Sequence, residues 1–236
     1  MAVLDSFGPL RASQLRIPLT KYGLREIILG SIFFIAALAV WLWVWWPATA
    51  LVVILWVGFL AFFRDPERRP PDEADVMLRP ADGTVHDVEQ VQPPGAYLDG
   101  PAVRIGIFMS VFSVHVNRAP AAGEVQWVEH TPGRYLDARD RQAQVQNEHN
   151  LVGMQLGDGR KIMVNQIAGA VARRIVCAVG PGRRLEAGER FGMVKFGSRL
   201  ELFLPAADQY AIAVKPGDKV KAGCSVLARY RRKEDA

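Results

Sequence analysis

The sequence predicts a mainly β domain that follows an N-terminal α-helical membrane hairpin. Three observations lead to this fold class. Residues 27–63 include no charged side chain, and beyond residue 75 short runs rich in β-branched residues alternate with Gly, Pro and Asp. No long amphipathic helical pattern accompanies these runs. With 50% hydrophobic and 22% charged residues among 236, the chain is too apolar for a disordered protein.

The uncharged run 27–63 is too long for a single membrane-crossing helix. At about 1.5 Å per residue it would extend roughly 55 Å, whereas a hydrocarbon core is about 30 Å thick. Pro47 lies where a turn over 47–49 would divide the run into arms 27–46 and 50–63, with four Trp residues beside the turn. Because the second arm is short, a hairpin that dips into one leaflet is an alternative to a full span. A cleaved signal peptide does not fit, since 26 residues precede the run.

Basic residues flank both ends of the hairpin, and the predicted turn has none. The flanking residues are Lys21, Arg25, Arg64, Arg68 and Arg69. The positive-inside rule therefore places both ends in the cytoplasm. We expect a cytoplasmic N-terminal segment (1–26), a polar linker rich in proline (64–75), and a domain on the cytoplasmic side of the cell (inner) membrane.

Residues 76–236 are expected to form one β domain of sandwich or barrel type. The predicted strands span 84–88, 103–116, 124–129, 161–167, 171–179, 199–204, 211–214 and 226–230. Two segments also share a pattern: Val179-Gly-Pro-Gly-Arg-Arg-Leu-Glu-Ala-Gly and Val214-Lys-Pro-Gly-Asp-Lys-Val-Lys-Ala-Gly. They resemble the hammerhead repeats of lipoyl and biotinyl carrier domains, which predicts a sandwiched barrel with quasi-twofold symmetry. Neither copy has the lysine that a carrier domain modifies, so a carrier role is disfavoured.

Four short segments of this domain contain residue types that can do chemistry. They are Pro80-Ala-Asp82-Gly83, Ser113-Val-His115-Val-Asn117-Arg118-Ala-Pro120, Asn147-Glu148-His149-Asn150 and Phe196-Gly197-Ser198-Arg199. A Gly-Ser pair alone is an ordinary turn. In this order, and behind an apolar hairpin, the four segments resemble the phosphatidylserine decarboxylase family in its short, archaeal-type form, whose processing motif is Phe-Gly-Ser-Arg. The resemblance covers nearly the whole chain.

The resemblance implies a precursor that cuts itself. Ser198 would attack the carbonyl of Gly197, divide the chain into a β chain (1–197) and an α chain (198–236), and become a covalent pyruvoyl group. Glycine suits the acyl side because it allows close approach and tolerates strained dihedral angles. The implied reaction is pyruvoyl-dependent decarboxylation of phosphatidylserine to phosphatidylethanolamine, with the pyruvoyl group as electron sink. A homodimer of αβ units is also implied.

A serine hydroxyl needs a base that a third group holds in place. The resemblance supports His115 as that base and Asp82 as the orienting carboxylate. Longer family members have a second histidine where this chain has Arg118, and a guanidinium cannot act as a base, so the identity of the base stays open. Arg118 suits phosphate or carboxylate binding. The other expected substrate-binding residues are Asn117, Glu148, His149 and Arg199, although a polar loop with a capping Asn explains His149 equally well.

Other classes of function are less well supported. The four histidines lack the spacing of a ligand pair, so we expect no metal. The net charge of +5 suits anionic lipid, whereas the aromatic residues concentrate in 27–63 and leave few for stacking on nucleic-acid bases. A non-enzymatic, membrane-anchored adaptor with a lipoyl-like β domain is the alternative function. A diacyl or an ether-linked lipid would present the same headgroup.

Overall fold

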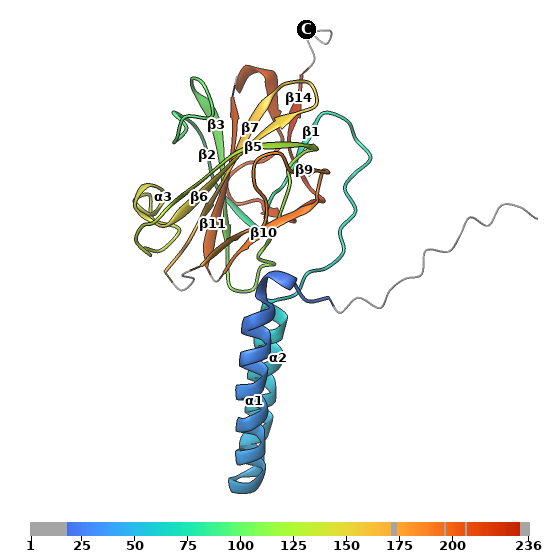
Figure 1. Cartoon of the computed structure of the whole chain (residues 1–236), viewed down its shortest axis with the longest axis vertical. Helices are drawn as coiled ribbons and strands as arrows, with labels where there is room; N and C mark the ends of the chain where they lie inside the picture. The colour runs from blue at the N-terminus through green and yellow to red at the C-terminus, as the bar shows by residue number, and fades with distance from the viewer. Residues whose placement is uncertain (1–17, 171–173, 196, 206, 232–236) are drawn as a thin grey trace, which may run out of the picture.

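A computed structural model describes residues 18–170, 174–195, 197–205 and 207–231. Figure 1 shows a helical hairpin that projects from one end of a β domain. The mainly β class and the apolar N-terminal helix are confirmed. Most of the predicted N-terminal segment, Phe196 of the processing motif and the start of the predicted strand 171–179 lie outside the described residues.

The hairpin breaks at a single residue. Its elements are η1 (Lys21–Gly23), α1 (Leu24–Val44) and α2 (Trp46–Phe62). Trp45 alone separates α1 from α2, in an extended conformation, so the predicted turn over 47–49 is wrong. Pro47 lies in the first turn of α2, where its missing N–H removes no helical hydrogen bond. Among the described residues, one helix, Lys21–Val44, is long and apolar enough to cross a membrane, and α2 is shorter.

The β domain consists of three sheets whose named strands pair antiparallel. The eight-stranded sheet has the order β13-β2-β3-β11-β7-β6-β5-β9, and the two three-stranded sheets have the orders β4-β10-β8 and β1-β14-β12. The strands are β1 (Val76–Leu78), β2 (Gly83–Val91), β3 (Ala102–Met109), β4 (Val116–Arg118), β5 (Gly123–Thr131), β6 (His149–Leu156), β7 (Lys161–Ile167), β8 (Ile175–Cys177), β9 (Arg184–Leu185), β10 (Arg190–Val194), β11 (Ser198–Pro205), β12 (Tyr210–Ile212), β13 (Lys219–Val220) and β14 (Val226–Tyr230). Two short helical turns join them, α3 (Ala143–Gln146) and η2 (Ala207–Gln209). The predicted strands 161–167 and 226–230 coincide with β7 and β14.

Strand β11 lies in the middle of the large sheet, between β3 and β7. All its residues except Pro205 are buried. Leu202 and Leu204 belong to the main apolar core, whereas Phe203 belongs to a smaller cluster. Because side chains alternate along a strand, Ser198 points to the face of the main core and Arg199 to the opposite face.

The two copies of the repeated pattern make matching backbone hydrogen bonds. Corresponding donor–acceptor pairs are Gly182–Val125 and Gly217–Val85, at 2.7 and 2.8 Å, and Gly188–Ala119 and Gly223–Arg79, at 2.9 and 2.8 Å. Residues 79–85 and 119–125 therefore occupy equivalent places in the fold.

Two strand predictions fail for local reasons. The run 103–116 does not continue past Met109, because a turn follows in which the Ser113 N–H donates to the Ser110 carbonyl at 2.9 Å. Strand β6 was not predicted, because the polar residues 147–150 at its start are typical of a loop.

The segment after the hairpin is docked on the β domain. The buried Asp65 carboxylate pairs with Arg118 at 3.1 Å and with Arg190 at 2.6 Å. Arg118 also donates to the carbonyls of Pro66 and Gly188. The predicted linker 64–75 is thus fastened at its start, and the hairpin has a fixed exit from the domain.

Candidate active site

Ser198 is the first residue of β11 and lies at one end of the large sheet. It is buried, and it pairs with Met109, the last residue of β3. Its hydroxyl donates to the backbone carbonyl of Val194 at 3.5 Å. The preceding Gly197 has φ of +61°, a left-handed conformation that costs a residue with a Cβ roughly 1–2 kcal/mol. The turn from β10 to β11 therefore favours the glycine of this motif.

The carbonyl group of Gly197 packs directly against Gly169. A methyl group on Gly169 would overlap the Gly197 carbonyl oxygen and would lie 2.9 Å from its carbonyl carbon. A second glycine, distant in sequence, is thus needed for the backbone next to Ser198 to adopt its position.

His115 is a buried, neutral imidazole. Its Nδ1 lies 2.9 Å from the Ser113 carbonyl oxygen, and a carbonyl can only accept, so Nδ1 is the protonated nitrogen. Nε2 is then the basic nitrogen, and it has no hydrogen-bond partner among the described residues. Burial lowers the pKa of His115 to about 4, an effect that the Ser113 hydrogen bond opposes. The side chain is therefore a free base at neutral pH.

Val194 connects His115 to Ser198. Its N–H donates to the His115 carbonyl at 3.4 Å, and its own carbonyl accepts from the Ser198 hydroxyl. The serine and the histidine are thus both bound to the last residue of β10.

Asp82 makes contacts other than the one expected. Its carboxylate accepts from the Ala222 N–H at 2.7 Å and from Arg68 at 2.9 Å. Among the described residues, the His115 ring is held at Nδ1 by the Ser113 carbonyl. Asp82 and Ser113 do line the same pocket, so a role for Asp82 in orienting His115 stays a prediction.

Asn117 belongs to a chain of buried amides next to Ser198. Its Nδ2 lies near the Met109 sulfur at 3.9 Å, and its Oδ1 accepts from Gln166 at 2.8 Å. Gln166 in turn accepts from Asn150 at 3.0 Å. These bonds hold the three buried amides in place. Gln166 was not predicted from the sequence because it belongs to no motif.

Arg118 and Arg199 both bind carboxylates of the chain itself. Arg118 pairs with Asp65, and the fully buried Arg199 pairs with Asp87 at 2.6 Å and Glu201 at 2.8 Å. Arg199 also lies on the face of β11 opposite Ser198. The two guanidinium groups expected to bind substrate are thus already paired in the structure.

His149 and Glu148 lie at the start of β6. His149 Nδ1 is 2.9 Å from the Asn147 carbonyl, and its side chain lines a pocket of about 230 Å³ beside Glu201, on the face of the sheet opposite Ser198. Glu148 accepts from the Tyr135 hydroxyl at 2.7 Å. The structure does not bring these two side chains together with Ser198.

The base of the hairpin packs against the site. The Phe62 ring lies 4.4 Å, centre to centre, from the His115 imidazole. Around it is an apolar cluster that joins α1, α2 and β10, with buried members Ile27, Phe62, Phe63 and Met193. The domain-proximal ends of α1 and α2 therefore shield the His115 imidazole from water.

An ion pair also joins the hairpin to the segment before Ser198. The nearly buried Lys195 ammonium lies 2.7 Å from the Glu26 carboxylate in the first turn of α1. Arg174 lies 3.6 Å from the same carboxylate. The backbone two residues before Gly197 is thus fastened to the start of the hairpin.

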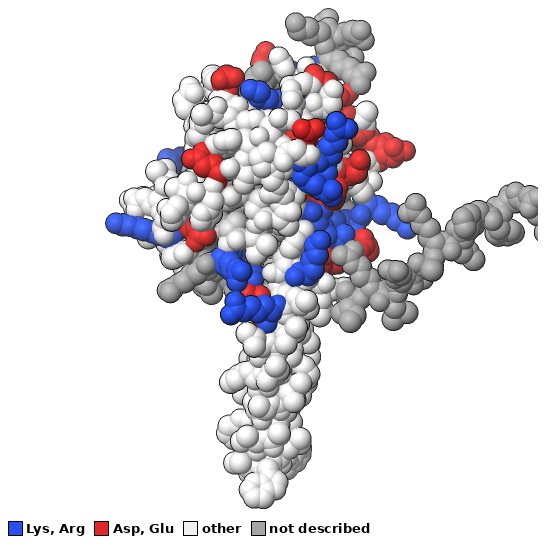
Figure 2. Space-filling view, viewed as in Figure 1, with Lys and Arg blue, Asp and Glu red and all other residues white. Residues whose placement is uncertain are grey.

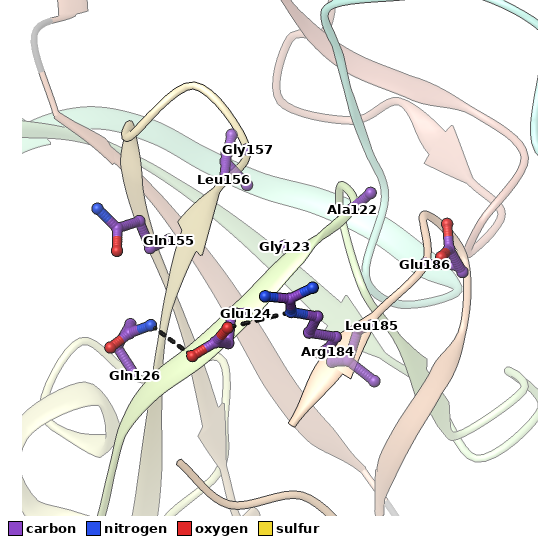
Figure 3. A pocket seen from close by; sticks show the side chains of 10 residues that line it. All are labelled: Ala122, Gly123, Glu124, Gln126, Gln155, Leu156, Gly157, Arg184, Leu185 and Glu186. Atoms are coloured by element: carbon purple, nitrogen blue, oxygen red, sulfur yellow. Dashed lines mark hydrogen bonds and ion pairs between the residues drawn. The ribbon is translucent and has the colours of Figure 1, made fainter. Parts of the chain in front are cut away.

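Two larger pockets lie in equivalent parts of the β domain. One, of about 440 Å³, adjoins the site and is lined in part by Asp82, Phe112, Ser113 and Lys219. The other, of about 420 Å³, is drawn in Figure 3, and none of its lining residues is a predicted site residue.

The comparisons with known proteins agree with the motifs. The sequence model of the family described as phosphatidylserine decarboxylase matches residues 57–228. The chain belongs to the phosphatidylserine decarboxylase family. A relative named phosphatidylserine decarboxylase proenzyme, from Symbiobacterium thermophilum, is 42% identical over 200 residues, which are 85% of this chain and 91% of the relative. Proteins of the same name from Cereibacter sphaeroides and Rhodopirellula baltica are 44% identical over 187 residues (78% and 80% covered) and 37% identical over 218 residues (92% and 90% covered).

The match to the decarboxylase family covers every predicted site residue. As a member of this family, the chain is an enzyme of the decarboxylase type. Sequence reasoning missed three residues of the candidate site: Phe62 in α2, Gly169 just after β7 and Lys195 just after β10. They reach the site through contacts between segments that are far apart in the sequence.

Proposed function

We propose that this chain is a membrane-anchored precursor that cuts itself between Gly197 and Ser198 and then decarboxylates phosphatidylserine to phosphatidylethanolamine. The observation that carries the proposal is the shared attachment of Ser198 and His115 to Val194, with the basic Nε2 of His115 left unpaired among the described residues. The names of the relatives support the substrate.

Self-cleavage needs only groups that are present. The Ser198 hydroxyl oxygen attacks the Gly197 carbonyl carbon, the peptide C–N bond breaks, and an ester forms, while His115 transfers the hydroxyl proton to the leaving nitrogen. Loss of the α proton of residue 198 and departure of the Gly197 carboxylate leave a Cα–Cβ double bond. Water then replaces the amine nitrogen, which leaves as ammonia, and residue 198 becomes a pyruvoyl group.

The site fits such a group. The pyruvoyl carbonyl would form at the α carbon of residue 198, because the hydroxyl oxygen leaves with the Gly197 carboxylate. Residue 198 pairs with Met109, whose sulfur lies 3.9 Å from Asn117 Nδ2, and Val194 joins its hydroxyl to the backbone of His115. When formed, the group supplies the electron sink that makes loss of carbon dioxide possible. His115 Nε2 can accept a proton from the substrate ammonium and return one to the carbon that has lost carbon dioxide.

The remaining site assignments stay predictions. Asp82 is retained as the orienting carboxylate of the relay, and Asn117, Arg118, Glu148, His149 and Arg199 as substrate-binding residues. To bind substrate, Arg118 would have to release Asp65, and Arg199 would have to release Asp87.

The hairpin supports a location at the membrane. Figure 2 shows a helical stalk without charge and basic side chains gathered where it meets the domain. With basic residues at both ends, the domain is proposed to face the cytoplasm from the inner membrane. The matching hydrogen bonds of the two repeats support the lipoyl-like barrel, and a dimer of αβ units stays a prediction.

Intact mass tests the proposal. Cleavage would convert the 26.1 kDa chain into fragments of about 22 and 4 kDa, in proportion to residue number. Ser198→Ala should remain a single chain and release no carbon dioxide from carboxyl-labelled phosphatidylserine, while the control Ser110→Ala should be cut normally. A purified wild-type protein that stays uncut and inactive would refute the enzymatic proposal and leave the anchored adaptor.

A further inference from the structure

The turn between β3 and β4 exposes apolar side chains beside the hairpin. Phe112 is 84% exposed and Val111 is 44% exposed. Outside the hairpin, the described residues include only two other large exposed apolar side chains, Tyr135 and Val145. Arg64, two residues after the end of α2, donates to the Phe112 carbonyl, so this turn is fixed at the point where the chain leaves the hairpin.

The pocket of about 440 Å³ lies directly behind this turn. Phe112 is at its rim, and Arg64, Lys219 and Lys221 give it positive charge. Its one carboxylate, Asp82, is paired with Arg68. Neither lysine has a carboxylate partner among the described residues, and both are exposed. An anion that entered the pocket would therefore meet unneutralised cations.

The second pocket provides an internal comparison. It stands at the equivalent place of the other repeat, with Arg184 where the first has Lys219 and Glu186 where the first has Lys221. There Arg184 is paired with Glu124 at 3.2 Å, as Figure 3 shows. The fold itself does not require two unpaired lysines, so their presence beside the hairpin points to a ligand.

The pocket also adjoins the reacting residues. Its wall includes Ser113, whose carbonyl holds His115, and Phe108, the neighbour in β3 of the Met109 that pairs with Ser198, on the opposite face of the sheet. A headgroup held by its phosphate in this pocket would thus lie close to the site without leaving the membrane surface.

We propose that this pocket admits the phosphodiester of an anionic lipid from the bilayer, with Lys219 and Lys221 as its anion contacts and Phe112 seated among the acyl chains. The inference rests on the proposed function and adds the route by which its substrate enters. A phosphodiester and two ammonium groups are complementary in charge, and an aromatic side chain is stable at the boundary of headgroups and acyl chains.

Two substrates separate the two contacts. The full chain is assayed on phosphatidylserine in phosphatidylcholine vesicles and on glycerophosphoserine, which has the phosphodiester and no acyl chains. Lys219→Gln with Lys221→Gln should raise KM about tenfold on both substrates at low salt and leave kcat unchanged, and high salt should diminish the difference. Phe112→Asp should raise KM roughly tenfold on vesicles only.

Matched controls are available in the chain. Arg184→Gln removes a cation from the equivalent pocket, and Val145→Asp alters an equally exposed apolar residue; both should leave KM unchanged on both substrates. All variants should still cut themselves at the wild-type rate, because none touches Ser198 or His115.

Several results would overturn the inference. One is an unchanged KM for glycerophosphoserine in the double lysine variant. Another is a KM increase in Arg184→Gln as large as that of the lysine variant. A third is a KM increase in Phe112→Asp that is as large on glycerophosphoserine as on vesicles. Calorimetric binding of glycerophosphoserine to uncut Ser198→Ala, with and without the two lysine changes, tests the pocket without turnover. Wild-type protein that binds the diester through the lysines and yet releases no carbon dioxide would refute the proposed function and retain the pocket.

Discussion

Replacement of Gly169 by alanine tests the geometry next to Ser198 most directly. Contacts of a Cβ atom are ordinary from 3.4 Å, and a methyl group at Gly169 would lie 2.9 Å from the Gly197 carbonyl carbon and would overlap its oxygen. The carbonyl would have to move by about half an ångström at carbon and by more at oxygen, since a close-packed interior leaves no other space. Ala138, at 3.4 Å, would not be displaced.

This displacement sets the expected size of the effect. Misplacement of reacting groups by 1 Å can cost about 100-fold in rate. We therefore expect Gly169→Ala to slow self-cleavage by roughly 10- to 100-fold, which is about 1.4–2.7 kcal/mol in activation free energy.

The assay is a time course of the uncut chain and its two fragments on a denaturing gel, with intact mass as identification. Gly157→Ala is the matched control, because a methyl group there meets nothing within 4 Å. Thermal unfolding of both variants shows whether the fold is retained. If folded Gly169→Ala cuts itself at the wild-type rate, the Gly197 carbonyl is not confined as described.

Three further predictions concern His115 and the hairpin base. The pKa of His115 is about 4 in the folded protein and about 6.5 in the unfolded chain, so the neutral side chain contributes fully to stability above pH 6.5. About 3 kcal/mol of unfolding free energy is lost as the pH falls to 4. Urea unfolding at pH 7 and 4.5 measures this loss, and an equal pH dependence in His115→Gln would contradict the prediction. The rate of self-cleavage should accordingly stay constant from pH 8 to about 5 and decline below that. In Phe62→Ala, where water reaches the imidazole, the decline should begin nearer pH 6.5. Identical pH profiles would show that Phe62 does not shield His115. Glu26→Gln leaves the nearly buried Lys195 ammonium without its carboxylate and should lower the unfolding free energy by about 1–3 kcal/mol. The same substitution should cost less in a chain that already has Lys195→Gln, and strictly additive losses would show that the two residues are not coupled.

Sequence reasoning was most successful where the information is local. The short β-branched runs predicted β7 and β14. The predicted strand 199–204 lies within β11, and the glycine expected to tolerate strained dihedral angles, Gly197, has a left-handed φ of +61°. The break of the hairpin was misplaced because proline is as well suited to the first turn of α2 as to the turn itself.

Contacts across long sequence separations were not predictable. Arg118 binds Asp65, 53 positions away, and Arg199 binds Asp87, 112 positions away, so two residues with the chemistry of a substrate site are engaged within the chain. In the same way, no local pattern indicates that Gly169 would meet Gly197.

The central place of β11 has a consequence for the cut form that we propose. If the bond before Ser198 is cut as proposed, β11 becomes the first strand of a separate short chain, held in place by hydrogen bonds to β3 and β7, by apolar contacts and by the ion pair of Arg199 with Asp87. Heat or denaturant could then release that chain, and neither the severed bond nor the lost serine could be restored. After unfolding, the proposed cut form would have to rebind its own middle strand from solution, so its lifetime would be set by its rate of unfolding.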